Sequence, residues 1–225
     1  MTGPTITARR IGTEAQPIAI IDGFHPDPEA LRTHAGQATF EPGRNHYPGI
    51  RAALPPDYFA AIRPALTATL AGVFDHAGTL ALIDASYAMV TTPPARLTLP
   101  QRLPHVDAID PDRIALVHFL DPARNDGTAF YRHRTTRFET LDAARAPAYR
   151  ASLADDLRRS GEPPAGYIAG STPLFERVSC IEARYNRAIL YRSALFHSGA
   201  IAPGAVLSDD PARGRLTVTA FLLLG

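Results

Sequence analysis

Six short segments rich in β-branched and aromatic residues follow one another from residue 79 to the C-terminal end, separated by Gly, Pro, Asn or Asp. Such compositions favour strands, and the separating residues favour turns. Many short strands punctuated by turns indicate an antiparallel sandwich or barrel rather than alternating βαβ units. The segments are TLALIDASYAMVTT, RIALVHFL, GTAFYRHR, FERVSCIEARY, RAILYRSALFH and RLTVTAFLLL.

Helical patterns lie before and within this series. DPEALRTHAGQ begins with Asp27 as a candidate N-cap and Pro28 at the first helical position. PPDYFAAIRPALTATLAGVF repeats apolar residues at helical spacing, and TLDAARAPAYRASLADDLRRS interrupts the strands as a helical insertion. The pattern therefore predicts a mainly β fold with flanking helices.

We expect the 225 residues to form a single domain. Residues 1–75, in which only QPIAIIDGF is typical of a strand, are predicted to be mostly helical and to brace the outside of the barrel. Residues 76–225 are predicted to form the β core. The insertion at about 140–160 is expected near the site entrance, because long connections often carry substrate selection.

Composition excludes several classes of function. All 23 basic residues are Arg, which excludes Schiff-base and phosphate-loop chemistry on Lys. Guanidinium groups or neutral hydrogen-bond donors must therefore hold any buried carboxylate. The formal net charge of +1 gives no reason to expect nucleic acid or an anionic membrane surface as a partner.

The single cysteine, Cys180, excludes a disulfide framework and a cysteine zinc site. Its apolar surroundings, FERVSCIEA, predict a buried and inert thiol. The N-terminal MTGPTITARRIGTEAQ has no apolar stretch, and no run approaches the ~20 apolar residues of a membrane helix. We therefore expect a cytoplasmic protein.

A candidate metal site begins in LPQRLPHVDAID, where His105 and Asp107 are two residues apart and project to the same side of an extended chain. A non-haem iron site needs two imidazoles and one carboxylate. The third ligand has to come from His118, His133 or His197. His197 is favoured because it follows an apolar strand and precedes a Gly turn.

The last strand carries a candidate carboxylate anchor. Alternation in RGRLTVTAFLLLG places Arg215, Thr217, Thr219 and Phe221 on one face. Burying an arginine and two threonines in an apolar core would cost free energy. The cost is offset if the guanidinium binds a carboxylate. Arg213 has the same parity and remains a rival anchor; Arg215 is favoured because it lies deeper in the strand.

PHVD, FHSG and RGRLTVTAF, in this order, resemble the Fe(II)/2-oxoglutarate-dependent oxygenase superfamily over roughly residues 80 to 225. The chain looks most similar to prolyl-hydroxylase-like members, in a bacterial branch of unassigned substrate. The resemblance implies a double-stranded β-helix (a jelly roll, cupin-like) that holds Fe(II) through His105, Asp107 and His197. It also implies that Arg215, with Thr217, binds the distal carboxylate of the cosubstrate 2-oxoglutarate.

Three further residues have open roles. Tyr131, in GTAFYRHR, is a candidate for hydrogen bonding to a bound carboxylate, and its alternative is a tether to backbone. His118 is expected to be a hydrogen-bonded core histidine, and His133 to line the site behind the ligands. Which face of this strand meets the cavity stays open.

The function implied by the resemblance is a 2-oxoglutarate-dependent dioxygenase that hydroxylates a small molecule or a protein side chain. One alternative is a non-catalytic jelly-roll module that binds a small ligand. Another is a cupin-like metal enzyme without 2-oxoglutarate. The oligomeric state, with a homodimer among the options, stays open.

Overall fold

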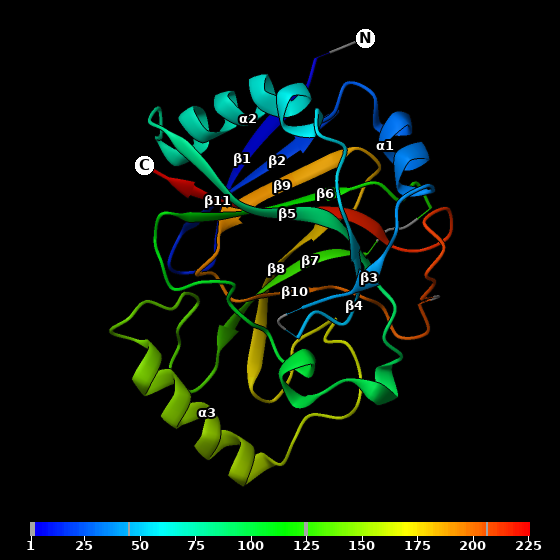
Figure 1. The fold of residues 1–225 in the computed structure, drawn as a ribbon. Helices are drawn as coiled ribbons and strands as arrows, with labels where there is room; N and C mark the ends of the chain where they lie inside the picture. Colours follow the sequence, from blue (N-terminus) through cyan, green and yellow to red (C-terminus); the bar gives the residue numbers. More distant parts are fainter. Residues whose placement is uncertain (1–2, 45, 124–125, 206) are drawn as a thin grey trace.

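Two antiparallel sheets face each other in the computed structural model, which describes residues 3–44, 46–123, 126–205 and 207–225 (Figure 1). The large sheet has eight strands. In spatial order they are β1 (Thr5–Ile11), β2 (Gln16–Asp22), β9 (Arg187–Arg192), β6 (Arg113–Phe119), β11 (Leu216–Leu224), β5 (Leu80–Val90), β4 (Gly49–Ala52) and β3 (Glu41–Pro42). The small sheet has three strands, β10 (His197–Gly199), β7 (Gly127–His133) and β8 (Phe175–Glu182).

The helices lie outside the two sheets. Figure 1 shows α1 (Pro28–Ala35) and α2 (Tyr58–Phe74) on the face of the large sheet that points away from the small sheet. The third helix, α3 (Ala146–Ser160), lies beyond the small sheet. Two short 3-10 helices, η1 (Pro94–Arg96) and η2 (Leu99–Arg102), precede β6. This arrangement is the predicted mainly β jelly roll with flanking helices.

Three apolar clusters hold the layers together. The first joins α1 and α2 to the large sheet, with Leu66 and Val218 among its members. The second fills the space between the two sheets, where Phe130 meets Ile189. The third lies between the small sheet and α3 and includes Tyr149. Burial of apolar surface on both faces of each sheet stabilises the fold, at roughly 25 cal/mol per Å².

Local sequence signals explain the helix boundaries. The side chain of Asp27 accepts a hydrogen bond from the amide of Ala30 at 3.0 Å, and Pro28 opens α1, so the predicted cap is confirmed. The predicted second helix is also confirmed, with Pro64 inside it. None of the described helices has the length and apolar character needed to cross a membrane.

The first 75 residues contain four strands as well as two helices, so their prediction as mostly helical was wrong. The missed strand β1 is exposed except for Ile11, because it forms the edge of the large sheet. An edge strand that buries neither face shows no hydrophobic alternation. It pairs with β2 over seven residue pairs, and the two strands form one side of the large sheet.

Two expectations about the small sheet were wrong. Helix α3 packs on the outer face of this sheet, and none of its residues lines the cavities of the site described below. Cys180 is exposed, because it lies on the edge strand β8, which pairs with no described strand other than β7. Its apolar neighbours in sequence alternate between faces and do not enclose it.

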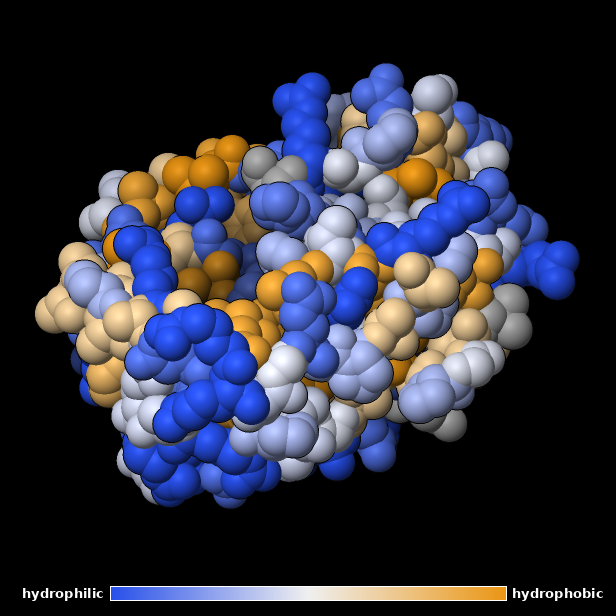
Figure 2. Space-filling model, turned by 90° about the horizontal axis from the view of Figure 1, so that it is seen from below, coloured by the Kyte–Doolittle hydropathy of each residue, from blue (hydrophilic) through white to orange (hydrophobic). Residues whose placement is uncertain are grey.

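One face of the molecule is hollowed, as Figure 2 shows from below the view of Figure 1. Hydrophilic and hydrophobic residues lie side by side around this hollow. The surface thus combines a recess with mixed polarity, which is the usual setting of a small-molecule site.

Candidate metal centre and its cavities

Backbone pairing brings the two halves of the candidate metal site together. His105 follows η2 and forms an isolated antiparallel bridge with His197, with reciprocal amide-to-carbonyl bonds of 3.0 and 2.9 Å. The amide of Asp107 donates to the carbonyl of Ser193 at 2.9 Å. The predicted strand around His197 is broken: β9 ends at Arg192, and His197 opens the separate strand β10. The turn between them lets one segment hold both His105 and Asp107.

Three potential ligand atoms converge at this point. One nitrogen or oxygen atom from each of His105, Asp107 and His197 lies within 4.8 Å of the others. The Nε2 atom of His197 is 3.3 Å from Oδ2 of Asp107, and Nε2 of His105 is 3.8 Å from Oδ1. Two imidazoles and one carboxylate form the facial ligand set that suits a divalent non-haem metal.

Each of the two histidines presents a ring nitrogen that can bind a metal. Nδ1 of His197 lies 2.9 Å from the carbonyl of Leu195 and must donate to it, so Nε2, beside Asp107, is the ring atom left to bind a metal. Partial desolvation and the nearby His197 lower the pKa of His105 below its usual 6.5, although 55% of its side chain is exposed. His105 is therefore neutral near pH 7, and the donor set fits a metal ion.

A small inner chamber of about 110 Å³ adjoins the ligands. Thr217, Thr219 and Phe221 line it from β11, and Arg215 lines it from the position just before this strand, so the predicted face is confirmed. The opposite face of β11 belongs to the apolar cluster under α1 and α2. Thr128 and Gly199 line the chamber from the small sheet.

Arg215 is buried in this chamber with 7% of its surface exposed. Its Nε donates to Oδ2 of Asp126 at 3.0 Å, and its NH2 group donates to the carbonyl of Gly127 at 3.0 Å. One edge of the guanidinium is thereby held, and the edge formed by NH1 and NH2 has donors left for a ligand. The hydroxyl of Thr217 donates to the carbonyl of Ala88 at 3.0 Å, so it can only accept from a ligand.

Two sequence-predicted residues do not reach the chamber. Tyr131 faces the cluster under α3, and its hydroxyl donates to the carbonyl of Ile168 at 3.4 Å. The inward face of β7 carries Thr128 and Phe130 instead. Arg213 is exposed and lines neither cavity of the site. Alternation groups residues on a face, but only packing decides which face points inward.

The other two histidine candidates lie away from the metal ligands. His118 is fully buried as expected, 3.2 Å from the Tyr58 hydroxyl and 3.0 Å from Oδ1 of Asn186. Its pKa is lowered to about 3, chiefly because burial penalises the charged ring. His133 lies under α3, with Nε2 3.2 Å from Oδ2 of Asp156, and does not line the site.

An outer cavity of about 1010 Å³ opens above the ligands. His105 and Asp107 line it together with three residues that sequence reasoning missed, namely Tyr47, Arg51 and Arg113. Tyr47 and Arg51 lie in EPGRNHYPGIRA, which shows no periodicity and is typical of a loop. The only available signal was an arginine in the short apolar stretch GIRA.

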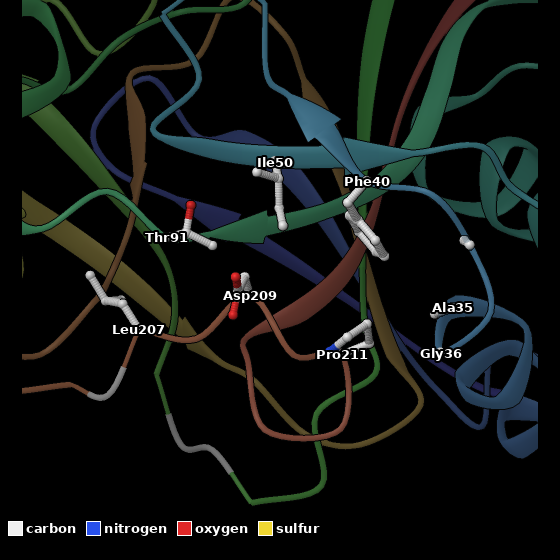
Figure 3. A pocket seen from close by; sticks show the side chains of 9 residues that line it. Ala35, Gly36, Phe40, Ile50, Thr91, Leu207, Asp209 and Pro211 are labelled. Carbon is white, nitrogen blue, oxygen red and sulfur yellow. The ribbon is translucent and has the colours of Figure 1, made fainter.

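A separate cavity of about 550 Å³ lies where the end of α1 meets β4 and the loop before β11 (Figure 3). Most of the side chains that line it are apolar, with Phe40 and Ile50 facing Leu207 across it. Among the described residues of the lining, Asp209 is the only one with an ionisable side chain, and it is exposed. This cavity lacks the convergent polar groups that mark a reactive site.

Comparison with known proteins places the chain among relatives of unknown function. The model of a family described as "Family of unknown function (DUF6445)" matches residues 2–222. No curated protein matches the sequence significantly.

Several solved structures are similar to this chain at low sequence identity. HygX from Streptomyces hygroscopicus, solved with nickel, 2-oxoglutarate and hygromycin B bound, is 15% identical over 94% of this chain and 84% of its own, with a TM-score of 0.50. An N-substituted L-amino acid dioxygenase from Burkholderia ambifaria is 12% identical over 99% and 96%, with a TM-score of 0.47. AviO1 from Streptomyces viridochromogenes is 15% identical over 98% and 89%, with a TM-score of 0.44. At these identities the likeness to HygX supports the fold alone.

Proposed function

The chain belongs to the family DUF6445, whose function is unknown, and we propose that this member is an Fe(II)- and 2-oxoglutarate-dependent oxygenase. The observation that carries the proposal is the convergence of His105, Asp107 and His197 within 4.8 Å beside a chamber that ends in a buried arginine. HygX, which has the same fold, was solved with nickel and 2-oxoglutarate bound. Membership of the prolyl-hydroxylase-like branch stays a prediction.

In this proposal His105, Asp107 and His197 hold Fe(II). The bound metal supplies activation of dioxygen. The reaction consumes R–H, dioxygen and 2-oxoglutarate and yields R–OH, succinate and carbon dioxide. One oxygen atom of dioxygen enters the substrate and the other enters succinate. Oxidation of the substrate supplies two of the electrons that reduce dioxygen, and oxidation of 2-oxoglutarate supplies the other two.

Arg215 receives the distal carboxylate of 2-oxoglutarate. The bonds from Arg215 to Asp126 and Gly127 hold the guanidinium in place before the cosubstrate arrives. This restraint limits the side-chain entropy lost on binding. The NH1 and NH2 donors can then bind both oxygens of the carboxylate. The small inner chamber suits the cosubstrate, and the larger outer cavity suits the substrate, a small molecule or a peptide side chain.

The test begins with metal binding under anaerobic conditions. About one Fe(II) or Mn(II) per chain is expected, and Asp107→Ala should weaken this binding strongly because it removes the anionic ligand. His118→Ala is the matched control, since His118 lies in the core, and it should affect the metal much less. If the protein binds no divalent metal, the non-catalytic ligand-binding module takes the place of the oxygenase.

The second step is titration of the Fe(II) protein with 2-oxoglutarate, followed by its visible charge-transfer band. Arg215→Met should weaken 2-oxoglutarate binding at least ~100-fold with the metal retained, because a buried charge partner is lost. The exposed Arg213→Met should change it by less than ~3-fold. Iron binding without a band at millimolar 2-oxoglutarate would replace this proposal with the cupin-like metal enzyme.

A further inference from the structure

Arg51, on β4, lines both the inner chamber and the outer cavity. Its NH1 group donates to the hydroxyls of Ser86 and Thr219, each at 3.0 Å. The guanidinium carbon lies 4.3 Å from the centre of the Tyr47 ring. The aromatic ring and the hydroxyls orient the guanidinium, yet none of these groups carries a negative charge.

Arg113, at the start of β6, lines the same outer cavity. Its guanidinium carbon lies 4.9 Å from the centre of the Phe221 ring. The Nε atom is buried and has no hydrogen-bond partner among the described residues. The carbonyl of Arg113 accepts from the amide of Ser193 at 2.8 Å, and the carbonyl of Ser193 accepts from Asp107 at 2.9 Å. Backbone hydrogen bonds through Ser193 thus connect Arg113 to Asp107, a candidate metal ligand.

Within the described part of the chain, neither arginine forms an ion pair with a carboxylate. Glu41 and Asp84 line the outer cavity too, but they do not pair with Arg51 or Arg113. Arg215, by contrast, is neutralised by Asp126. Oriented guanidinium groups without a counter-ion in a cavity are suited to receive an anion from solution.

The two guanidinium groups are arranged along one strand face. Arg51 is bonded to Thr219 and Arg113 lies over Phe221, and these β11 residues are two positions apart on the chamber face. That spacing corresponds to about 7 Å along the strand. His105 and Asp107 line the same cavity. An anion held there would keep the rest of its molecule beside the metal ligands.

We propose that the substrate carries an oxyanion, a carboxylate or a phosphate, which Arg51 and Arg113 bind in the outer cavity. This inference rests on the proposed oxygenase function, because it names the substrate class of that same site. It assigns the two arginines to the substrate and leaves Arg215 to the cosubstrate. The neutral part of the substrate, oriented by the anion, then reaches the metal ligands.

The test measures calorimetric binding of three probes, 3-phenylpropionate, phenyl phosphate and the uncharged 3-phenylpropionamide. One arm uses metal-free protein, and the other uses protein loaded with redox-inert Mn(II) and 2-oxoglutarate, which occupies the inner chamber. At least one anion should bind ~10-fold or more tightly than the amide in both arms. The tighter anion identifies the chemical class. Equal binding of the amide and both anions would overturn the proposal.

Arg51→Met and Arg113→Met should each weaken the binding of the preferred anion at least ~10-fold, since methionine keeps the apolar packing on the ring and removes the charge. Arg44→Met is the matched control, because Arg44 also lines the outer cavity but is exposed, and it should change binding less than ~3-fold. Circular dichroism of each variant checks that it is folded.

Two further measurements separate this inference from the proposed function. Arg113→Met should leave the 2-oxoglutarate titration within ~3-fold of wild type, because Arg113 lines the outer cavity and not the inner chamber. If it weakens 2-oxoglutarate as much as Arg215→Met does, Arg113 belongs to the cosubstrate site and the inference is wrong. Anion binding to the metal-free protein that depends on both arginines, without any 2-oxoglutarate band, would refute the oxygenase and leave the anion site standing.

Discussion

Arg215 and Asp126 form a buried ion pair at the inner end of the chamber, with Nε 3.0 Å from Oδ2 and both side chains less than a tenth exposed. The second oxygen of Asp126 is buried and has no hydrogen-bond partner among the described residues. The pair has two consequences. It orients the anchor, and it places a negative charge close to where the 2-oxoglutarate carboxylate is proposed to bind.

Asp126→Asn should therefore tighten 2-oxoglutarate binding at least ~3-fold, because the amide oxygen still accepts from Arg215 while the repulsion on the incoming carboxylate disappears. The same change should destabilise the ligand-free protein by about 3 kcal/mol, because a buried arginine loses its counter-charge. Urea unfolding with and without 2-oxoglutarate measures both effects. Weaker binding in Asp126→Asn than in wild type would argue against Arg215 as the anchor.

His118 should make stability depend on pH. The Oδ1 atom of Asn186 accepts from Nε2 of His118, and in the neutral ring Nδ1 accepts from the Tyr58 hydroxyl. Its pKa falls to about 3 in the folded state from 6.5. The unfolded chain therefore binds more protons between these values, and stability is complete above pH 6.5 and falls as the pH drops toward 3.

At pH 5 the loss attributable to this one histidine should be about 2 kcal/mol relative to pH 7.5. The measurement compares urea unfolding at the two pH values for wild type and His118→Gln. The variant should lose less stability on acidification, since glutamine does not titrate. An equal loss in both proteins would assign the acid sensitivity to other groups.

Tyr149 should anchor α3 to the small sheet. Its ring lies 5.1 Å from that of His133 and 4.8 Å from that of Phe196, centre to centre. Tyr149→Ala should cost about 3 kcal/mol of unfolding free energy, because it opens a cavity in the third apolar cluster. Arg150→Ala, one position along and exposed, should stay within about 0.5 kcal/mol of wild type. Equal effects would mean that α3 docks without this ring.

Cys180 should react with a thiol reagent in the native protein, because its side chain is exposed on the edge of the small sheet. Partial desolvation by its neighbours raises the thiol pKa, so labelling should be slower than for a free thiol and should accelerate as the pH rises above 7. Mass spectrometry of the native and urea-unfolded protein measures the two rates. A native protein that resists labelling until it is unfolded would restore the buried placement.

Much of the fold could be predicted because its signals are local. Asp27 and Pro28 start a helix through contacts within four residues. Strand alternation placed Arg215, Thr217 and Thr219 on one face, and the chamber contains all three. The strand β1 was missed because an exposed edge strand is held by backbone pairing with β2, which leaves no hydrophobic pattern.

The sequence by itself determined which residue types could do chemistry and which neighbours share a face, because strand and helix periods depend on near neighbours alone. The two-residue spacing was enough to place the side chains of His105 and Asp107 on the same side of the chain. Only the tertiary structure decided that Tyr131 faces α3, and that Asp126 meets Arg215 across 89 positions of the chain. It also decided that Arg51 joins the site. Contacts between distant segments follow from the packing of whole sheets, and no local pattern encodes that packing.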